Sequence, residues 1–469
     1  MERRRAVDTE PGKPTKSTRQ PASTKQPAGL QARQLAVELI SAVLDKRRAF
    51  DDALAASLAR PEHQSLAAND RGLARLIAAT VLRRHGQLTH IVNSFIERPL
   101  PPDRGRLTSI LLAAAAQLVF LGSAPHAVIN LAVEQTRRDP RARRFDRLTN
   151  AVLRRVAEKG AEIATAQDPI RLNIPDWLWN RWSTAYGEDA TRQIAEASLR
   201  EAPLDITVKS DAEGWIRKLG GVLLPTGSIR LVPEGRVENL PGFWEGAWWV
   251  QDAAAALPAK LFGNVAGKHV ADLCAAPGGK TAQLAAAGAH VTAVEVDPKR
   301  IDRLKDNLVR LQLATEIVEA DATEWQPDTR FDAVLVDAPC LSTGTIRRHP
   351  DILHLKREGD LERLVTLQER LLNNAARLVK PGGLLVYCTC SLEPEEGPQQ
   401  IERFLSRVDE FGRVPIQPGE AGIAAEWITA DGDLRTLPFH MPLEPEALSG
   451  MDGFYAARLR RRSEGDAAV

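Results

Sequence analysis

Cysteine is scarce in this 469-residue chain and confined to its last two fifths, where Cys274, Cys340, Cys388 and Cys390 lie. No pair has the CxxC spacing of a zinc site, and Cys388 and Cys390 would point to opposite faces of a strand. This pattern argues against a bound metal and against a disulfide framework. A single cysteine is more often a small core residue than a nucleophile. We expect Cys388 in the core and Cys390 at the end of its strand.

We expect neither an export signal nor a membrane span in this chain. Residues 1–29 are basic and rich in Pro, Ser, Thr and Gln, with no apolar segment, and we expect a disordered arm. The most apolar run, residues 107–124, is interrupted by polar residues and is at the short limit for a span. We expect a buried helix there and a cytoplasmic location.

Net charge is almost absent, but the two ends of the chain differ. Residues 1–160 hold 28 Lys and Arg against 15 Asp and Glu, whereas the remainder holds 34 against 46. Overall, 43% hydrophobic and 26% charged residues are typical of a folded globular protein, and the length indicates two or three domains. The basic front end indicates an anionic partner, most simply nucleic acid, although a merely solvated basic surface would look the same.

The first region, residues 30–160, has apolar residues at helical spacing and no strand-like alternation, which predicts an all-α bundle. One expected helix has Leu76, Val81 and Leu82 on its inner surface. A denser cluster of arginines surrounds Asp139 and would suit phosphate contacts. Its members are Arg137, Arg138, Arg141, Arg143 and Arg144.

The second region, residues 165–265, contains an expected helix from Pro175 and an expected strand at 204–209, which together predict a small α+β linker domain. At least six tryptophans fall in this region. Tryptophans stack on splayed RNA bases in some proteins, but they more often anchor a small core, and we favour the core.

The third region, residues 266–463, alternates short apolar strands with amphipathic helices, which predicts a mainly parallel, doubly wound α/β sheet. Asp297 and Pro298 mark the start of one helix. A later helix carries Gln368 within its apolar stripe of leucines. Ligands of such sheets bind beyond the carboxyl ends of the strands.

A glycine loop at 274–280 follows the first strand of this third region, and three acids, Glu295, Asp321 and Asp337, follow the next strands. The loop matches neither the GxxxxGK[ST] nor the GxGxxG pattern of phosphate binders. Glu295 is placed to accept the two hydroxyls of a ribose. Without a basic phosphate clamp, the set suits a nucleoside cofactor that lacks phosphates, such as S-adenosylmethionine.

At this point the chain resembles the RNA cytosine-5 methyltransferases, through the motifs at 272–281, 337–340 and 389–391 and further segments at 346–352 and 450–456. Residues 30–160 resemble the NusB-like RNA-binding domain. The whole architecture resembles the branch of the family that acts on bacterial 16S ribosomal RNA. The resemblance implies a Rossmann-like class I methyltransferase domain that uses S-adenosylmethionine. It also implies 16S ribosomal RNA as the partner, for an enzyme that we expect to be a monomer.

The resemblance also implies roles for individual residues. Cys390 would add to C6 of the cytosine, Cys340 would help to remove the C5 proton and release Cys390, and Asp337 would contact the N3 and amino edge of the base. The implied cofactor-binding residues are the three acids named above and the glycine loop, namely Cys274, Ala275, Ala276, Pro277, Gly278, Gly279 and Lys280. The sequence by itself does not decide which cysteine attacks.

Several alternatives stay open. Lys280 would orient the base or the Asp337 carboxylate, or would be a solvent-facing lysine of a helix start. Arg347, Arg348 and His349 are expected to hold RNA phosphates near a flipped nucleotide. The enzyme would act instead on tRNA or another ribosomal RNA site, or the chain would be an RNA-binding or antitermination factor with an inert methyltransferase domain. The intact motifs argue against the last alternative.

Overall fold

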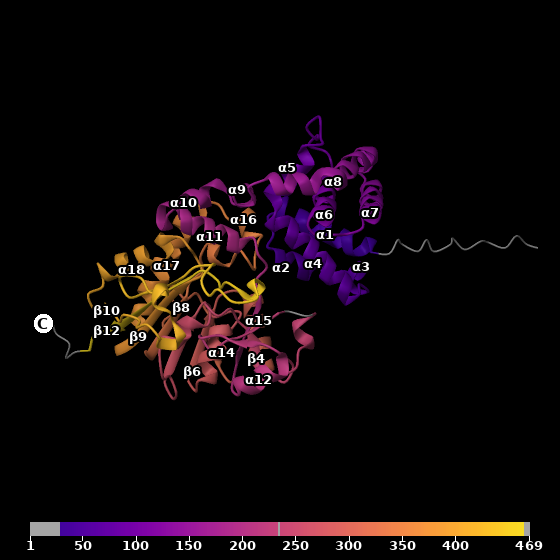
Figure 1. Cartoon of the computed structure of the whole chain (residues 1–469). Coiled ribbons are helices and arrows are strands. Elements are labelled where there is room, and N and C mark those ends of the chain that lie inside the picture. The colour runs from indigo at the N-terminus through magenta and orange to yellow at the C-terminus, as the bar shows by residue number, and fades with distance from the viewer. Residues whose placement is uncertain (1–28, 233–234, 464–469) are drawn as a thin grey trace, which may run out of the picture.

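A helical bundle forms the first part of the computed structural model, which describes residues 29–232 and 235–463 (Figure 1). The expected disordered arm therefore falls outside the described residues, apart from Gly29. The bundle consists of α1 (Leu30–Leu44), α2 (Phe50–Leu58), α3 (Pro61–Gln64), α4 (Ala68–Arg83), α5 (His85–Asn93), α6 (Leu107–Val119), α7 (Pro125–Arg138), a 3-10 turn η1 (Arg143–Phe145) and α8 (Asp146–Ala166).

Helix α6 is the centre of this bundle, as its apolar composition predicts. It contacts α1, α4, α5, α7 and α8, and its alanines and leucines, apart from Leu118, are almost fully buried. Within the described residues, no helix is long and apolar enough to cross a membrane. One expectation for the bundle is wrong: Leu76 is 40% exposed, because the buried face of α4 runs through Ile77 and Val81 instead.

Three further helices lead out of the bundle: α9 (Pro169–Asn173), α10 (Asp176–Tyr186) and α11 (Glu188–Ser198). The Asp168 carboxylate caps α9 by accepting hydrogen bonds from two of its first backbone N–H groups. Trp182 is buried in a core that these helices share with Ile346 and Leu392 of the third region. They lie above the main sheet in Figure 1 and pack on segments that follow its strands, such as those of Ile346 and Leu392.

A small antiparallel sheet follows, with strand order β2-β3-β1-β4. Its elements are β1 (Leu204–Val208), α12 (Ala212–Leu219), β2 (Val222–Leu223), β3 (Ile229–Leu231), a 3-10 turn η2 (Val237–Asn239) and β4 (Trp248–Val250). Trp248 fills the core of this unit and Trp249 is buried as well, whereas Trp244 is 71% exposed. Most tryptophans of the region are thus structural.

The main sheet has the order β10-β12-β9-β8-β5-β6-β7, with β11 paired to β12. Its strands are β5 (His269–Leu273), β6 (His290–Glu295), β7 (Glu316–Glu319), β8 (Phe331–Asp337), β9 (Val379–Thr389), β10 (Phe411–Arg413), β11 (Leu434–Thr436) and β12 (Phe454–Arg461). Its helices are α13 (Leu257–Lys260), α14 (Gly279–Ala286), α15 (Pro298–Arg310), α16 (Ile352–Leu355), α17 (Asp360–Leu378) and α18 (Pro398–Leu405). Strands β5 to β9 are parallel and the last three are antiparallel, which confirms the predicted fold class.

Both faces of this sheet are buried, which explains its nearly continuous apolar strands. Along β8, Ala333 and Leu335 pack into one core, whereas Val334 and Val336 pack into the other, beneath α17 and α18. Because β5 to β9 run parallel, their carboxyl ends lie at one common edge of the sheet. Asp297 caps α15 as predicted, by accepting a hydrogen bond from the backbone N–H of Lys299 at 2.9 Å.

Candidate active site

The glycine loop leaves the sheet between β5 and α14, at the carboxyl edge. Cys274 and Gly278 both have a positive φ, of 62° and 102°, so the chain turns sharply before α14 begins. A side chain at Gly278 would collide with Leu304, since an added Cβ would lie 2.6 Å from its Cδ1. The turn therefore needs glycine and presents bare backbone to the edge of the sheet.

Two of the predicted cofactor-binding acids end the neighbouring strands, in contrasting environments. Glu295 at the end of β6 is buried and accepts backbone N–H groups from Val296 at 3.0 Å and Asp297 at 3.2 Å. Arg300 forms an ion pair with it at 3.1 Å. Asp321, just beyond β7, is exposed, and hydrogen bonds from Thr323 lower its pKa.

This edge fits a cofactor without phosphate groups. Its two basic side chains, Lys280 and Arg300, are already paired with Asp337 and Glu295. Across the described residues, no group of His, Cys, Asp and Glu is arranged to hold a metal ion. Carboxylates with paired cations suit ribose hydroxyls and an ammonium group better than a pyrophosphate.

Asp272 is a further buried acid of this edge that we did not predict as a site residue. The Thr281 hydroxyl donates to its Oδ2 at 2.6 Å. Burial raises the pKa of Asp272 to about 7. Burial also raises the pKa of the Cys274 thiol, with the Glu295 carboxylate acting in the same direction, which disfavours a thiolate at this position.

The two remaining cysteines of the motifs face each other across the same edge. Cys340 lies in the loop after β8 and Cys390 directly follows β9, and their Sγ atoms are 3.6 Å apart. The hydrogen bond between the thiols lowers the pKa of Cys390 and raises that of Cys340. The Ser342 hydroxyl, 3.7 Å from Cys340 Sγ, adds to the same network. The contact therefore favours the thiolate on Cys390 and the protonated thiol on Cys340.

Asp337 lies between the cofactor loop and the cysteines, at the last position of β8. Lys280 Nζ donates to its Oδ2 at 2.8 Å, and the thiol of buried Cys388 is 3.6 Å from its Oδ1. Burial alone would lower the pKa of Lys280, but the Asp337 carboxylate raises it. The Lys280 ammonium also lies over the ring of Phe454, a contact that the sequence did not reveal. Lys280 thus faces Asp337 rather than solvent.

The structure contradicts the predicted role of Arg347 and Arg348 in holding RNA phosphates. Arg347 is buried and bound to Asp252 at 2.6 Å and to Asp452 at 2.8 Å, and Arg348 pairs with the same two acids. A guanidinium whose donors are consumed by buried carboxylates is not free to hold RNA. His349 is exposed, with Asp51 of the bundle 3.7 Å away.

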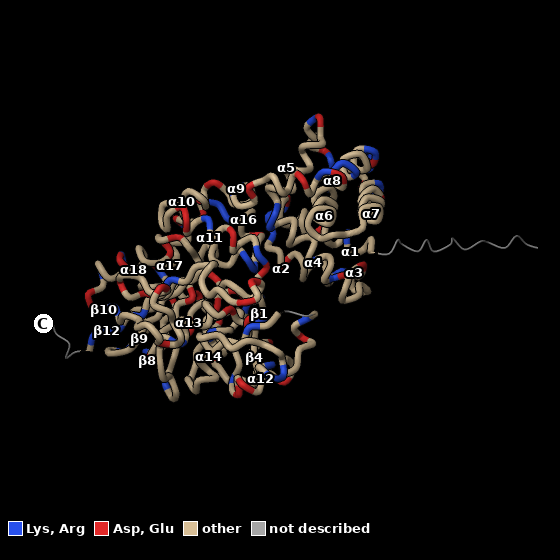
Figure 2. The backbone as a smooth tube through the Cα atoms, in the orientation of Figure 1, with Lys and Arg blue, Asp and Glu red and all other residues tan. Residues whose placement is uncertain are grey.

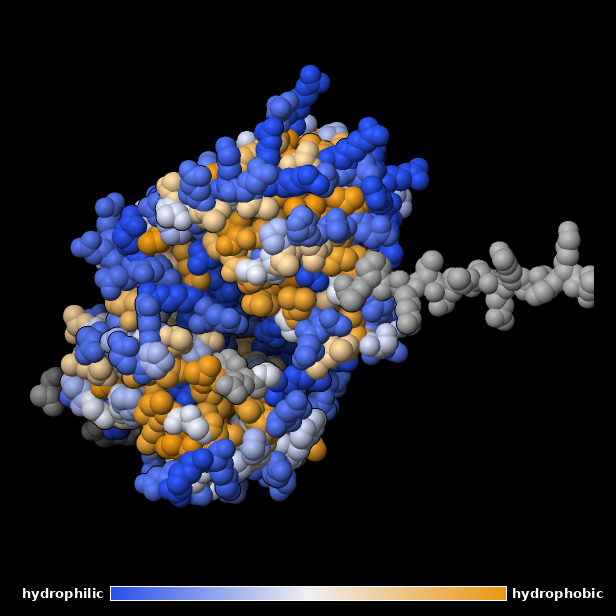
Figure 3. Space-filling model, turned by 45° about the vertical axis from the view of Figure 1, so that its right-hand side comes forward, coloured by the Kyte–Doolittle hydropathy of each residue, from blue (hydrophilic) through white to orange (hydrophobic). Residues whose placement is uncertain are grey.

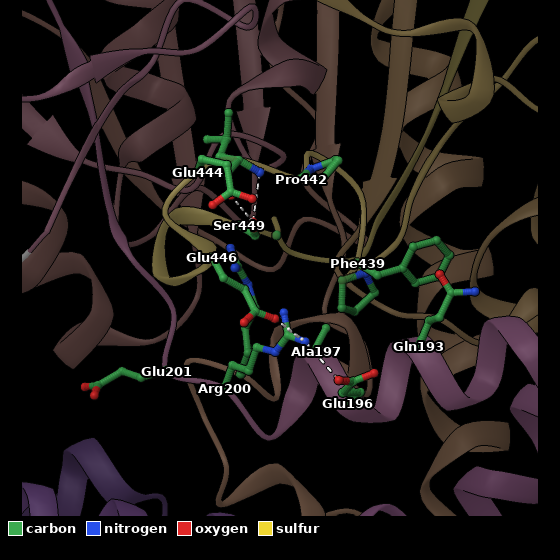
Figure 4. Close-up of a pocket in the computed structure, with 14 residues that line it drawn as sticks. Gln193, Glu196, Ala197, Arg200, Glu201, Phe439, Pro442, Glu444, Glu446 and Ser449 are labelled. Atoms are coloured by element: carbon green, nitrogen blue, oxygen red, sulfur yellow. Dashed lines mark hydrogen bonds and ion pairs between the residues drawn. The ribbon is translucent and has the colours of Figure 1, made fainter.

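A cavity of about 760 Å³ lies between α11 and the segment 438–450 (Figure 4). Glu196, Arg200 and Glu446 form linked ion pairs on its wall. It contains none of the predicted catalytic or cofactor-binding residues. A hydrophilic hollow is also visible between the upper and lower parts of the molecule in Figure 3.

The basic character of the front end is visible on the bundle surface. Figure 2 shows Lys and Arg gathered along α8 and the connection from α7. Several arginines of the predicted cluster are paired, such as Arg137 with Asp146 at 3.0 Å and Arg138 with Glu134 at 2.8 Å. Arg143, Arg147 and Arg154 are exposed and form no ion pair within the described part of the chain.

Comparison with known proteins identifies both halves of the chain. Residues 260–460 match the model of the family described as 16S rRNA methyltransferase RsmB/F, and residues 30–158 match the NusB family. A protein of Salmonella arizonae named ribosomal RNA small subunit methyltransferase B is 33% identical over 83% of this chain and 94% of its own length. Its namesake in Vibrio cholerae is 32% identical, over 92% of this chain and 98% of its own length. The crystal structure of the protein named PH0851 covers 93% of this chain and all of its own, with a TM-score of 0.73 and 24% identity, and shows the same fold.

Proposed function

Because the chain belongs to the family of ribosomal RNA small subunit methyltransferase B, an S-adenosylmethionine-dependent methyltransferase family, we propose that it methylates C5 of a cytidine in 16S ribosomal RNA. The observation that carries this proposal is the pair of cysteines with Sγ atoms 3.6 Å apart, at the same edge of the sheet as Asp337. The reaction would proceed through a covalent bond between Cys390 and C6 of the base.

Cys390 is the nucleophile of this mechanism. C5 of cytosine is a poor nucleophile until a group adds to C6, and a thiolate is well suited to that addition. The lowered pKa of Cys390, caused first by the hydrogen bond from Cys340, favours the thiolate form of Cys390. Cys390 is half-buried, whereas the thiol of Cys388 is fully buried and held at Asp337.

Asp337 positions the base and stabilises the charge that develops on it. Its side chain is 33% exposed, so a cytosine can reach it, and its second oxygen is held by Lys280. A carboxylate in this place accepts a hydrogen bond from the amino group of cytosine. It also accepts one from N3 once N3 takes a proton from solvent as Cys390 adds to C6, and this proton returns to solvent when Cys390 leaves. Lys280 thereby acts through Asp337, as a positioning residue.

The cofactor edge is built from the glycine loop, Glu295 and Asp321. When bound, S-adenosylmethionine supplies the methyl group on a sulfonium, which makes it an electrophile for C5. Glu295 and Asp321 would accept hydrogen bonds from its hydroxyl and amino groups, and the bare backbone at Gly278 would allow close approach.

Cys340 completes the reaction by removing the C5 proton. The Cys340 thiol first gives its proton to solvent, and the resulting thiolate then accepts the proton from C5. The electrons of the C5–H bond restore the C5–C6 double bond, the C6–Sγ bond breaks, and Cys390 leaves as a thiolate. One proton is released per methyl transferred, and the thiol of Cys340 again faces the thiolate of Cys390.

The test uses purified protein, tritiated cofactor and unmodified 16S RNA, with each cysteine replaced separately by alanine. We expect Cys340→Ala to accumulate an RNA adduct that survives denaturing electrophoresis, because its release step is blocked. Cys390→Ala and the double variant should form none. The opposite pattern would exchange the two roles, and a wild-type protein that labels no cytidine in 16S RNA would refute the proposal. Labelling of tRNA instead would favour the tRNA alternative.

A further inference from the structure

Hydrogen bonds hold the loop of Cys340 on both sides of the cysteine. Gln368 of α17 donates its amide to the carbonyl of Pro339 at 2.8 Å, directly before Cys340. The backbone N–H of Leu341, directly after Cys340, donates to both carboxylate oxygens of Glu396, at 3.1 and 3.2 Å. The same Gln368 amide donates to Glu396 at 2.8 Å, which closes the ring of contacts around the cysteine.

Glu396 is tied through its backbone to the strand that carries the other cysteine. The Tyr387 hydroxyl, three residues before Cys390, donates to the carbonyl of Glu396 at 2.9 Å. The Thr389 hydroxyl donates to the same carbonyl at 3.4 Å. Glu396 therefore connects the Cys340 loop, through its side chain, to the Cys390 strand, through its main chain.

A second set of hydrogen bonds lies beside those of Glu396 and Gln368. The Thr343 hydroxyl donates to Glu393 Oε2 at 2.6 Å, and the backbone N–H of Gly344 donates to the carbonyl of Cys390 at 2.9 Å. The Gly344 position has no room for a side chain, because an added Cβ would lie 2.0 Å from the carbonyl oxygen of Gly453. The segment from 340 to 344 is thus held at both ends.

Glu396 is a buried carboxylate without a cationic partner in the described part of the chain. Its side chain is fully buried, and among the described residues no arginine, lysine or histidine forms an ion pair with it. Burying an unpaired carboxylate is costly, and its hydrogen bonds come only from neutral groups. Burial raises the pKa of Glu396.

We propose that Glu396 is a positioning residue for the release step, which sets the place of Cys340 opposite Cys390. This inference rests on the proposed roles of the two cysteines. Attack by Cys390 needs the strand end, whereas removal of the C5 proton needs the loop that Glu396 and Gln368 hold. We call the hydrogen bonds of Glu396 and Gln368 to this loop the clamp. Loss of the clamp therefore affects release more than attack.

The test compares Glu396→Ala with Glu396→Gln in the adduct assay, alongside wild type and Cys340→Ala. Because misplacement by about 1 Å can cost about 100-fold in rate, we expect Glu396→Ala to lower kcat by about that factor. It should also accumulate the same denaturant-resistant RNA adduct as Cys340→Ala. Glu396→Gln keeps an acceptor for Leu341 and Gln368 and should restore turnover and remove the adduct.

Two further variants keep the outcome decisive. Glu402→Ala, at an exposed position of α18, is the matched control and should behave as wild type. If Glu396→Ala does not fold, as judged by circular dichroism, Gln368→Ala removes the other half of the clamp and should give the same adduct.

The outcomes separate this inference from the proposed function. An adduct with Cys340→Ala but none with the folded clamp variants would overturn the positioning role and leave the cysteine roles intact. A failure of Glu396→Gln to restore turnover would also overturn it. An absence of adduct with Cys340→Ala itself would overturn the proposed roles of the two cysteines, and the inference with them. A wild-type protein that labels no cytidine would refute the proposed function itself.

Discussion

Two chemically identical thiols are given different properties by their immediate surroundings. Their mutual hydrogen bond raises the pKa of Cys340 and lowers that of Cys390. Burial and the nearby Glu396 carboxylate also raise the pKa of Cys340. The environment of each residue therefore supports the division of labour that the family resemblance implies.

Removal of the Cys340 thiol should make Cys390 less reactive near neutral pH. The hydrogen bond from Cys340 is the largest cause that lowers the pKa of Cys390, so Cys340→Ala should raise that pKa. One hydrogen bond is worth about 1 kcal/mol, so we expect alkylation of Cys390 by iodoacetamide at pH 7 to slow about fivefold. The midpoint of the alkylation rate against pH should move upward.

Mass spectrometry assigns the alkylated residue in this measurement. Cys388 is fully buried and burial raises its pKa, so it provides an internal control that should remain unmodified in both proteins. An unchanged midpoint in Cys340→Ala would show that the two thiols are not coupled.

At the scale of secondary-structure elements, a buried ion network joins the small sheet to the catalytic loop. Arg230 of β3 binds Asp205 of β1 at 2.7 Å, and Asp252, just beyond β4, binds Arg347 and Arg348. Arg230 also donates to the carbonyls of residues 448 and 450, before β12. Arg347 and Arg348, which looked suited to RNA, thus work with Arg230 to hold the small sheet against the segments around residues 347 and 450.

Removal of one acid from this network should destabilise the fold. Asp252→Ala removes one of the two buried carboxylates that Arg347 and Arg348 share and leaves Asp452 alone with both cations. Breaking a buried pair in this way costs about 3 to 5 kcal/mol. We expect a loss of that size in the free energy of unfolding in urea.

The matched control is Asp302→Ala, at an exposed position of α15, which should change stability by less than about 0.5 kcal/mol. A change no larger in Asp252→Ala than in this control would mean that the network does not stabilise the fold.

At the scale of the whole molecule, the bundle is docked onto residues 347–354, which follow the loop of Cys340. The backbone N–H of Phe50 donates to Asp351 at 2.9 Å, and Arg83 donates to the carbonyl of Arg347 at 3.0 Å. His354 of α16 lies 2.8 Å from the carbonyl of Leu82. A domain with a basic surface is therefore attached beside the catalytic centre, which suits a large anionic substrate.

Reversal of charge on the bundle should weaken RNA binding without a change in the chemistry. We expect a variant that combines Arg143→Glu, Arg147→Glu and Arg154→Glu to bind 16S RNA more weakly in fluorescence anisotropy. The slope of log affinity against log salt should fall by about one for each phosphate that the variant no longer neutralises. The same three replacements at Arg363, Arg377 and Arg462, far from the bundle in sequence, serve as the control. Equal affinity and slope for the bundle variant and wild type would exclude this surface from RNA binding.

Local patterns in the sequence determined the fold class, since helical spacing, short apolar strands and the caps at Asp297 and Pro298 depend on near neighbours. They also identified the residues of the proposed site, because a glycine loop and the ends of parallel strands meet at one edge by the geometry of the fold. The buried Lys280 and its contact with Asp337 were among the alternatives left open.

Only the tertiary structure decided the state of the charged groups. The sequence favoured RNA-binding roles for Arg347 and Arg348. Their partners, Asp252 and Asp452, lie about 100 residues away on either side, so no local pattern reveals the ion pairs. Likewise, Gln368 and Glu396 are 28 residues apart, and only folding brings both to the loop of Cys340. Sequence motifs report which groups the chain carries, whereas burial and long-range pairing, which set the protonation and availability of those groups, arise only when distant segments pack.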